Sequence, residues 1–496
     1  MADSARDTFP CPVAVNAGRD PEGIALRGND AALTHAELHR MVHRWEQRFT
    51  AEGLAVGDRV ALLAGNSLAH ATLVYAALRY GVVLAPLNPR LDATAWQDHL
   101  RRLNCRFLLV DREYRPFARQ SGLRHGLLEL PEQTDRALDS NEPPPRIPCP
   151  RPASIIFTSG SSGRAKGVVL SAGNHLASAR SANAHLPLKP DHCWLAALPF
   201  NHVGGLAILF RTALAGCCCR VVTSFAPEVT WELIRRGEVS HLSLVPTMLR
   251  HLLSCRPDAL PDARLTAILL GGGPAGTALL HDPRVRDLPL LTTYGLTETA
   301  SQVSTLPLEA PAAERVSAGR PLPGVAMEIV DDANQTVATN VTGRIRVRCE
   351  AVCLGYLDHE DQPVRDAGGW FTTSDFGFFD DPGYLHVVGR QDEVFISGGE
   401  NVHPAPIETA AAAYPGVSEC AVIAVPDEEW GKRPLLLVSA DPDAALDLDG
   451  LENHLAEQLP SLLRPETIVL VKDFPRSTIG KIDKPRLRRE FLRSNQ

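Results

Sequence analysis

Apolar segments of strand length alternate with helix-like segments from about residue 20 to residue 310 of this 496-residue chain. Residues 66–80 have a helical pattern that ends at Gly81, and the apolar residues 82–87 follow directly. Residues 106–111 are a second apolar run of strand length. Strands that alternate with helices are typical of largely parallel sheets covered by helices. The alternation therefore predicts a layered α/β architecture.

The pattern changes toward the C-terminus, which predicts a second domain. Residues 141–152 contain six prolines, as expected for a linker or a surface crossing. From residue 344 onward, β-rich segments are separated by Gly and Asp turns, and a basic helix is expected from Lys484. A chain of this length is expected to contain more than one domain. We place the boundary near Arg390–Asp392, between domains of residues 1–391 and 392–496.

Composition and charge argue against several classes of protein. The net charge of −8, from 50 basic and 58 acidic residues, does not favour a nucleic-acid binder. The N-terminus lacks the apolar core of a signal peptide. Arg211 and Arg220 interrupt the most apolar run, residues 203–222, so no uninterrupted run of about 18 apolar residues is available to span a bilayer. Neighbouring side chains of Cys217–Cys219 diverge along a strand, and no second Cys/His pair has zinc-finger spacing. We expect a cytoplasmic protein with reduced cysteines and no stable membrane insertion.

The most informative motif is the sequence TSGSSGRAKG at residues 158–167, which combines four hydroxyls, three glycines and a lysine. Glycines allow backbone N–H groups to turn toward an anion, while the hydroxyls and the lysine add donors and positive charge. A Walker A loop would need glycine at position 165 and Ser or Thr at position 167, where this chain has Ala165 and Gly167. The segment also lies between two expected strands, whereas a Walker A loop precedes a helix. A phosphate-binding loop is predicted, and a flexible turn without function is the alternative.

Three later segments could complete a nucleotide site. In YGLTET, residues 294–299, the Tyr294 ring can stack on a purine, Thr297 can donate to phosphate and Glu298 can bind Mg²⁺. In WFTTSD, Asp375 can accept hydrogen bonds from ribose hydroxyls, and GRQD at residues 389–392 closes the large domain. Each segment alone could be structural, as a strand end with a helix cap or as a turn.

Together, in this order and at this spacing, the four segments resemble the adenylate-forming superfamily of acyl-CoA synthetases, firefly luciferase and peptide-synthetase adenylation domains. The resemblance covers residues 34–488. It implies a large N-terminal domain of stacked α/β subdomains and a small, mobile α+β C-terminal domain. Four shorter sequences resemble more narrowly the 2-succinylbenzoate–CoA ligases of menaquinone biosynthesis. They are GNH at 173–175, LPFNHVGG at 198–205, TASQ at 299–302 and ISGGEN at 396–401.

The resemblance also implies a role for individual residues. Those implied to bind ATP or AMP are Thr158, Ser159, Gly160, Ser161, Ser162, Gly163, Lys166, Gly272, Gly273, Pro274, Tyr294, Gly295, Asp375 and Arg390. The implied catalytic residues are Lys481, Thr297, Glu298 and His202, with Glu298 as the Mg²⁺ ligand. The acyl pocket would include His202, Ser301 and Gln302, the CoA tunnel Gly398 and Gly399, and the hinge Asp392. Ser374 stands where the family usually has glycine, and Arg164–Ala165 where it usually has Lys-Pro, but neither change removes a catalytic group.

The implied reaction joins a carboxylic acid to AMP and then passes the acyl group to the thiol of CoA. Attack on an anionic α-phosphate depends on positioning and charge neutralisation, which Mg²⁺ at Glu298, Lys166 and Lys481 would supply. Lys481 serves only the first step, so a rotating small domain would remove it before the second. The cofactors and co-substrates expected are ATP, Mg²⁺ and CoA. No residue can be assigned from sequence to a second substrate carboxylate.

The expected reaction is 2-succinylbenzoate + ATP + CoA to 2-succinylbenzoyl-CoA + AMP + diphosphate. Alternatives are another aryl- or fatty-acyl-CoA ligase, an adenylation enzyme that loads a carrier protein, a luciferase-like oxidase, and a regulator that only binds nucleotide. Taken alone, His202 could be a structural histidine and Gly398–Gly399 a β-turn between strands. Small molecules rather than nucleic acids are the expected partners, and self-association into a homo-oligomer is left open.

Overall fold

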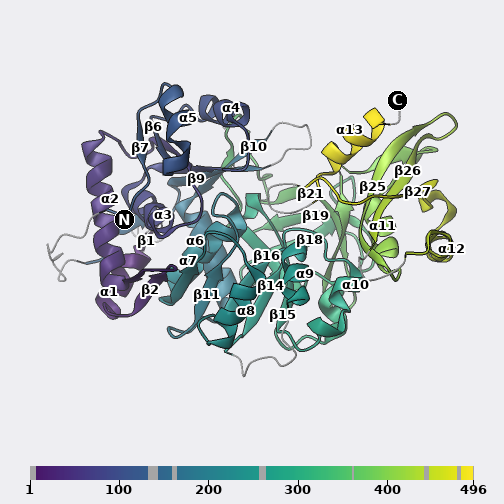
Figure 1. The fold of residues 1–496 in the computed structure, drawn as a ribbon, viewed down its shortest axis with the longest axis horizontal. Coiled ribbons are helices and arrows are strands. Elements are labelled where there is room, and N and C mark those ends of the chain that lie inside the picture. Colours follow the sequence, from purple (N-terminus) through teal and green to yellow (C-terminus); the bar gives the residue numbers. More distant parts are fainter. Residues whose placement is uncertain are drawn as a thin grey trace.

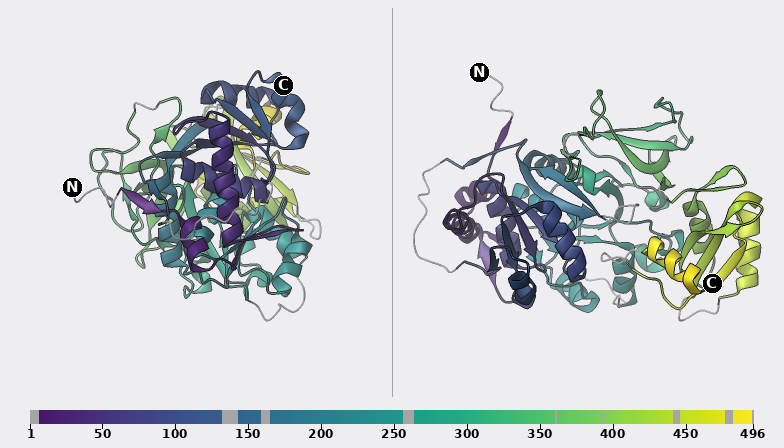
Figure 2. Two further views of the ribbon diagram at one scale, coloured as in Figure 1. Left: turned by 90° about the vertical axis from the view of Figure 1, so that its left-hand side faces the viewer. Right: turned by 90° about the horizontal axis from the view of Figure 1, so that it is seen from above.

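The computed structural model describes residues 7–131, 143–158, 165–255, 264–359, 362–391, 393–440, 446–476 and 482–494. Two stacked sheets and a third, smaller one form the main body, and the C-terminal residues form a separate lobe (Figure 1). The lobe lies at the opposite end of the molecule from α2, as both the front view and the view from above show (Figure 2). The layered α/β architecture predicted from the sequence is confirmed.

The first sheet has the strand order β20-β10-β9-β5-β4-β6-β7. Its central strands β9, β5, β4, β6 and β7 run parallel, and β10 returns antiparallel to β9. Lys166 pairs with Thr158, so the Gly/Ser-rich segment connects two strands of a hairpin as predicted. The strand bounds are β4 Arg59–Leu63, β5 Val83–Leu87, β6 Phe107–Val110, β7 His125–Leu127, β9 Pro152–Thr158, β10 Lys166–Ser171 and β20 Gly355–Tyr356.

The second sheet has the order β17-β16-β15-β14-β13-β11-β12-β2-β3. The strands from β15 to β2 in this order are parallel, and β3, β16 and β17 are antiparallel additions at the edges. The strand bounds are β2 Ile24–Arg27, β3 Ala32–Thr34, β11 Cys193–Ala196, β12 Cys218–Val221, β13 His241–Leu244, β14 Ala267–Leu270, β15 Leu290–Leu296, β16 Ser301–Thr305 and β17 Arg320–Pro321.

Helices join the two sheets into one hydrophobic core. Buried residues of α2, α3, α6 and α7 pack with strands of both sheets, and α6 and α7 lie between β9 and β11 in Figure 1. The helix α3 begins after Ser67, whose hydroxyl accepts the His70 N–H, and it ends at Gly81 as predicted. The helices of this body are α1 Pro12–Arg19, α2 His35–Ala51, α3 Leu68–Tyr80, α4 Ala93–Leu103, α5 Arg115–Gln120, α6 Ala172–His185, α7 Val203–Ala215, α8 Pro227–Arg235, α9 Pro246–Ser254 and α10 Thr277–Leu280.

An antiparallel sheet of order β18-β19-β21-β22 leads into the C-terminal lobe, whose largest sheet is β25-β26-β27. The bounds are β18 Ala326–Val330, β19 Gly343–Arg348, β21 Phe371–Phe379, β22 Leu385–Arg390, β23 Phe395–Ser397, β24 Glu400–Val402, α11 Pro404–Ala412, β25 Val417–Asp427, β26 Gly431–Ala440, α12 Leu448–Gln458, β27 Thr467–Leu470 and α13 Lys484–Ser494. The basic helix expected from Lys484 is α13. Among the residues described, no helix combines the length and apolarity that a membrane span requires.

Three local features of the structure go beyond the sequence signal. Within the proline-rich residues 141–152, β8 (Arg146–Pro148) pairs with β1 (Thr8–Pro10), because Ile147 is buried in the core. The strand β15 continues through Tyr294 to Leu296, because β16 pairs with it. Asp375 lies within β21 rather than in a turn, and its partner in the register is Arg390 of β22. In each case pairing with another strand, which the local signal does not contain, determines the element.

Candidate active site

Tyr294, Asp375 and Arg390 meet although the first is far from the others in sequence. The Tyr294 hydroxyl donates to Asp375 Oδ2 at 2.6 Å, and Arg390 Nη1 lies 3.5 Å from Asp375 Oδ1. Asp375 is buried, and burial followed by the nearby Asp375 charge raises the pKa of Tyr294. Residues predicted to contact adenine and ribose are therefore brought together. Their contact with nucleotide remains a prediction.

A second cluster contains Glu298, Tyr356 and Lys166, and Glu298 follows Tyr294 by four residues in the sequence. It belongs to the 3₁₀ turn Thr297–Thr299, and its Oε1 accepts a hydrogen bond of 3.0 Å from the Tyr356 hydroxyl. Lys166 Nζ lies 5.6 Å from the centroid of the Tyr356 ring. Burial, followed by the charge of Glu298, raises the pKa of Tyr356. A carboxylate oriented by one neutral hydroxyl suits Mg²⁺, which prefers oxygen ligands and leaves several positions for water or phosphate.

Sequence reasoning missed Tyr356, which comes from the short strand β20 paired with β10. No local motif marks it. Only the three-dimensional structure shows that Tyr356 lies between Lys166 of the predicted phosphate loop and the predicted metal ligand Glu298.

The turn that follows Glu298 is strained. Ala300 and Ser301 have φ angles of 54° and 142°, in a region that favours glycine. The Thr299 side chain holds this turn, since its hydroxyl accepts the Leu296 N–H at 3.1 Å and donates to the Ser301 carbonyl at 2.8 Å. A side chain on Gly295 would place its Cβ 2.3 Å from that same carbonyl, so the close approach of β16 requires glycine there. Strained residues of this kind concentrate at functional sites.

Ser301 contacts a buried arginine that sequence reasoning did not assign to the site. Arg211 of α7 donates from Nη2 to Ser301 Oγ at 2.9 Å and is only 2% exposed. Within the described part of the chain, its guanidinium makes no ion pair and its Nε has no hydrogen-bond partner. Desolvation lowers the pKa of Arg211 to about 10, which still leaves it charged at neutral pH. In the sequence, Arg211 is noticeable only as the single charged residue within the apolar helix α7.

The other acyl-pocket residues have less distinctive surroundings. His202 precedes α7 as its N-cap and is partly exposed. Nine residues of helix, about 13 Å, separate it from Arg211. Gln302 is buried on β16 and donates to Thr305 Oγ1 at 2.9 Å. The structure thus brings Ser301 to Arg211, and the roles of His202 and Gln302 in substrate binding remain predictions.

Several predicted site residues lie outside the described residues or in loops. Gly272, Gly273 and Pro274 follow β14, beside β15 with its Tyr294. Thr158 ends β9 opposite Lys166. Thr297 is half-buried in the turn that contains Glu298. The residues outside the described part of the chain are Ser159, Gly160, Ser161, Ser162, Gly163, Asp392 and Lys481.

Gly398 and Gly399 form the turn between β23 and β24. Ser397 pairs with Glu400, and the two glycines have φ angles of 55° and 89°. A Cβ on Gly398 would lie 2.4 Å from the Trp430 ring. The alternative of a β-turn between strands is confirmed, while a role in CoA binding remains a prediction.

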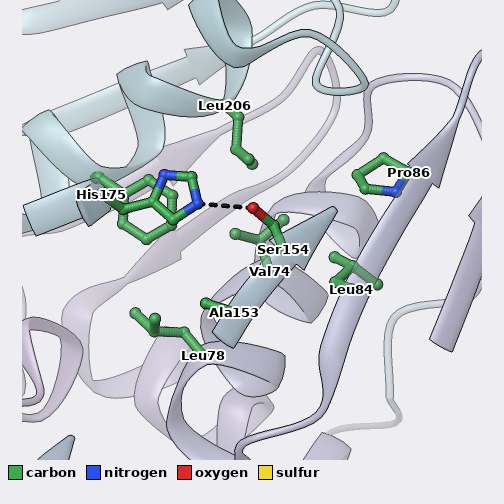
Figure 3. A pocket seen from close by; sticks show the side chains of 9 residues that line it. Val74, Leu78, Leu84, Pro86, Ala153, Ser154, His175 and Leu206 are labelled. Atoms are coloured by element: carbon green, nitrogen blue, oxygen red, sulfur yellow. Dashed lines mark hydrogen bonds between the residues drawn. The ribbon is translucent and has the colours of Figure 1, made fainter. Parts of the chain in front are cut away.

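A buried histidine and serine near α7 belong to the core (Figure 3). His175 Nε2 and Ser154 Oγ are 2.8 Å apart, and the imidazole stacks on Phe210 with ring centroids 4.3 Å apart. Desolvation lowers the pKa of His175 to about 3, so the ring is neutral. The adjoining cavity of about 10 Å³ holds no more than one water molecule. This pair has no room for a substrate, which favours a structural role for the histidine of the GNH sequence.

Comparison with known proteins identifies the family. The AMP-binding enzyme family matches residues 13–357, and the AMP-binding enzyme C-terminal domain matches residues 406–481. A 2-succinylbenzoate–CoA ligase from Geobacillus kaustophilus is 34% identical over 478 residues, which cover 95% of each chain. The o-succinylbenzoate CoA synthetase from Bacillus subtilis in complex with the acyl-adenylate intermediate OSB-AMP has a TM-score of 0.87 at 30% identity, covering 97% of this chain and 98% of that one.

Other structures of the Bacillus subtilis synthetase also match this chain over most of its length. The complex with ATP and magnesium ion has a TM-score of 0.86 at 30% identity, covering 97% of this chain and 100% of that one. A double mutant bound with the product analogue OSB-NCoA scores 0.72 at the same 30% identity, covering 97% and 98%. The matches in sequence and structure extend over nearly the whole chain, which belongs to the AMP-binding enzyme family.

Proposed function

We propose that this protein is an acid–CoA ligase that converts 2-succinylbenzoate, ATP and CoA into 2-succinylbenzoyl-CoA, AMP and diphosphate. The reaction passes through an acyl-adenylate. Relatives with this activity in their names match over nearly the full length of the chain. The adenylate-forming fold, together with residues suited to nucleotide and magnesium, supports the same reaction.

Arg211 is the observation that carries the substrate assignment. A dicarboxylic acid has one carboxylate that reacts and a second that stays charged. An unpaired buried charge costs several kcal/mol, so its retention requires a compensating group. Arg211 is charged, nearly inaccessible and without an acidic partner among the described residues. A second substrate carboxylate would compensate it, whereas the apolar tail of a fatty acid would leave it unpaired.

The two polar clusters account for the nucleotide half of the reaction. Asp375 and Arg390 would hold the ribose and Tyr294 the adenine, with Lys166 beside the phosphates. Glu298 would bind Mg²⁺, which neutralises phosphate charge, and Thr297 would contact the α-phosphate. The reacting carboxylate then attacks the α-phosphorus and pyrophosphate leaves. In the second step the CoA thiol attacks the acyl carbonyl, and AMP leaves with its phosphate.

The two steps need different surroundings, so we also propose that residues 392–496 move against residues 1–391. Asp392 would be the hinge, and Lys481 would serve adenylation alone. The turn at Gly398–Gly399 would admit the pantetheine arm of CoA in the second arrangement. A cytoplasmic location is part of the proposal, supported by the eleven free cysteines of the chain.

An ATP–pyrophosphate exchange screen tests the proposal directly. The acids are 2-succinylbenzoate, the two monocarboxylates 3-benzoylpropionate and 2-butanoylbenzoate, and octanoate. We expect the fastest exchange with 2-succinylbenzoate and CoA-dependent release of AMP with that acid. The monocarboxylate that still reacts identifies which carboxylate is activated. Faster exchange with octanoate than with 2-succinylbenzoate would overturn the substrate assignment, and no exchange with any acid would overturn adenylation itself.

A further inference from the structure

The guanidinium of Arg211 lies over the ring of Trp194. Its central carbon is 5.3 Å from the ring centroid, within the range of a cation–π interaction. Trp194 belongs to β11 and is 2% exposed, as is Arg211 itself. A cation that water cannot reach gains more from an aromatic face than an exposed cation does. Among the described residues, Trp194 and the Ser301 hydroxyl are therefore the main groups that stabilise the buried charge of Arg211.

The ring is itself fixed in place. Its Nε1 donates to Ser243 Oγ on β13 at 3.1 Å, and the imidazole of His241 lies with its centroid 5.1 Å from the ring. Desolvation, and then the neighbouring His192, lowers the pKa of His241 to about 3, so the imidazole against the Trp194 ring is neutral. Neighbouring strands thus determine the plane on which the guanidinium rests.

The two contacts of Arg211 use different parts of the group. Ser301 accepts a hydrogen bond from one N–H at the edge of the guanidinium, and the Trp194 ring packs against the face of the guanidinium. A guanidinium has five N–H donors in a rigid plane, and Ser301 accepts from one of those of Arg211. An arginine side chain is otherwise flexible. Because Trp194 holds the face of the guanidinium and Ser301 holds one edge, the direction of the remaining N–H donors is defined.

We propose that Trp194 is a positioning residue for recognition of the second substrate carboxylate. It acts through Arg211, whose free donors it aims at that carboxylate, and it does not touch the reacting atoms. The inference rests on the proposed function, because it assumes a dicarboxylic acid as substrate. A role in the hydrophobic core alone is the competing explanation, since Trp194 packs among buried residues of that core.

The test measures discrimination between two acids. For each variant, kcat/KM is determined with 2-succinylbenzoate and with the monocarboxylate analogue that reacts, and the ratio is taken. This ratio does not depend on the fraction of enzyme that is folded. Trp194→Leu removes the aromatic face, and we expect the ratio to fall about tenfold with the KM for ATP unchanged. Trp194→Phe retains a face and should stay within about threefold of wild type.

Arg211→Met provides the background for a double-mutant cycle. In that variant the ratio should be low already, and adding Trp194→Leu should lower it no further. If Trp194→Leu fails to fold, Trp194→Met fills more of the space and has the same expected effect on the ratio. An unchanged ratio in the tryptophan variants, or an equal fall with and without Arg211, overturns the positioning role. A wild-type enzyme without preference for the dicarboxylate would instead overturn the proposed function.

Discussion

Replacing Arg250 by glutamine should slow adenylate formation up to about fivefold and leave thioester formation from a supplied acyl-adenylate unchanged. Arg250 lies on α9 of the main body, and its Nη1 is 3.0 Å from Glu419 Oε1 on β25 of the C-terminal lobe. Arg476 of the lobe contacts the same carboxylate. The pair between Arg250 and Glu419 thus links parts of the chain that must separate if the lobe rotates.

The magnitude follows from the partial burial of the pair. The Arg250 side chain is 31% exposed and that of Glu419 13%, so the pair belongs at the upper end of the range for surface ion pairs, about 1 kcal/mol. Loss of about 1 kcal/mol from one of two orientations changes their ratio about fivefold. The structure has a TM-score of 0.87 to the acyl-adenylate complex of the Bacillus subtilis synthetase and of 0.72 to a double mutant bound with the product analogue. We expect the pair to stabilise the orientation that forms the adenylate.

The assay measures the two half-reactions separately. ATP–pyrophosphate exchange reports the first, and CoA thioester formation from synthetic acyl-adenylate reports the second. Arg235→Gln is the matched control, because it removes an ion pair with Glu232 that lies entirely within α8. Equal slowing of both half-reactions in Arg250→Gln, or the same change in the control, would refute this reasoning. High salt should weaken the effect by screening the wild-type pair.

Three further predictions concern other sites. Glu298→Gln should raise the Mg²⁺ concentration needed for half-maximal adenylation at least about tenfold, because it removes an anionic oxygen ligand; an unchanged Mg²⁺ titration would remove Glu298 from the metal site. His175 has a folded pKa of about 3, below its unfolded value, so its contribution to stability is complete above pH 6.5 and falls as the unfolded chain takes up a proton. Urea unfolding should therefore show about 1 kcal/mol less loss of stability between pH 6.5 and 5.5 in His175→Gln than in wild type, and equal losses would count against the buried neutral imidazole. Gly398→Ala should lower the free energy of unfolding by about 2 kcal/mol, because it combines a positive φ with a clash against Trp430. Gly399→Ala meets open space and should lose only about 1 kcal/mol, so equal losses in chemical unfolding would contradict the contact.

Sequence reasoning succeeded where the signal is local. Gly81 ends α3, the Gly/Ser-rich segment joins two strands, and α13 begins at Lys484, each as predicted. It failed where pairing with another strand determines an element, as with Asp375, which lies inside β21 and not in a turn. Pairing with a partner strand depends on the whole sheet, and local propensity does not contain that information.

The sequence by itself predicted the segments expected to bind nucleotide and, through them, the class of reaction. Their chemistry is local, because glycines, hydroxyls, a lysine and carboxylates keep their character wherever the chain places them. Only the tertiary structure placed Arg211 beside Ser301 and Trp194, and Tyr356 beside Glu298. In the sequence, Arg211 merely interrupts an apolar segment; the fold buries it without an acidic partner among the described residues and places Trp194 against its face. What a charge costs, and which ligand would compensate it, depends on the groups that surround it in space, and most of those come from distant parts of the chain.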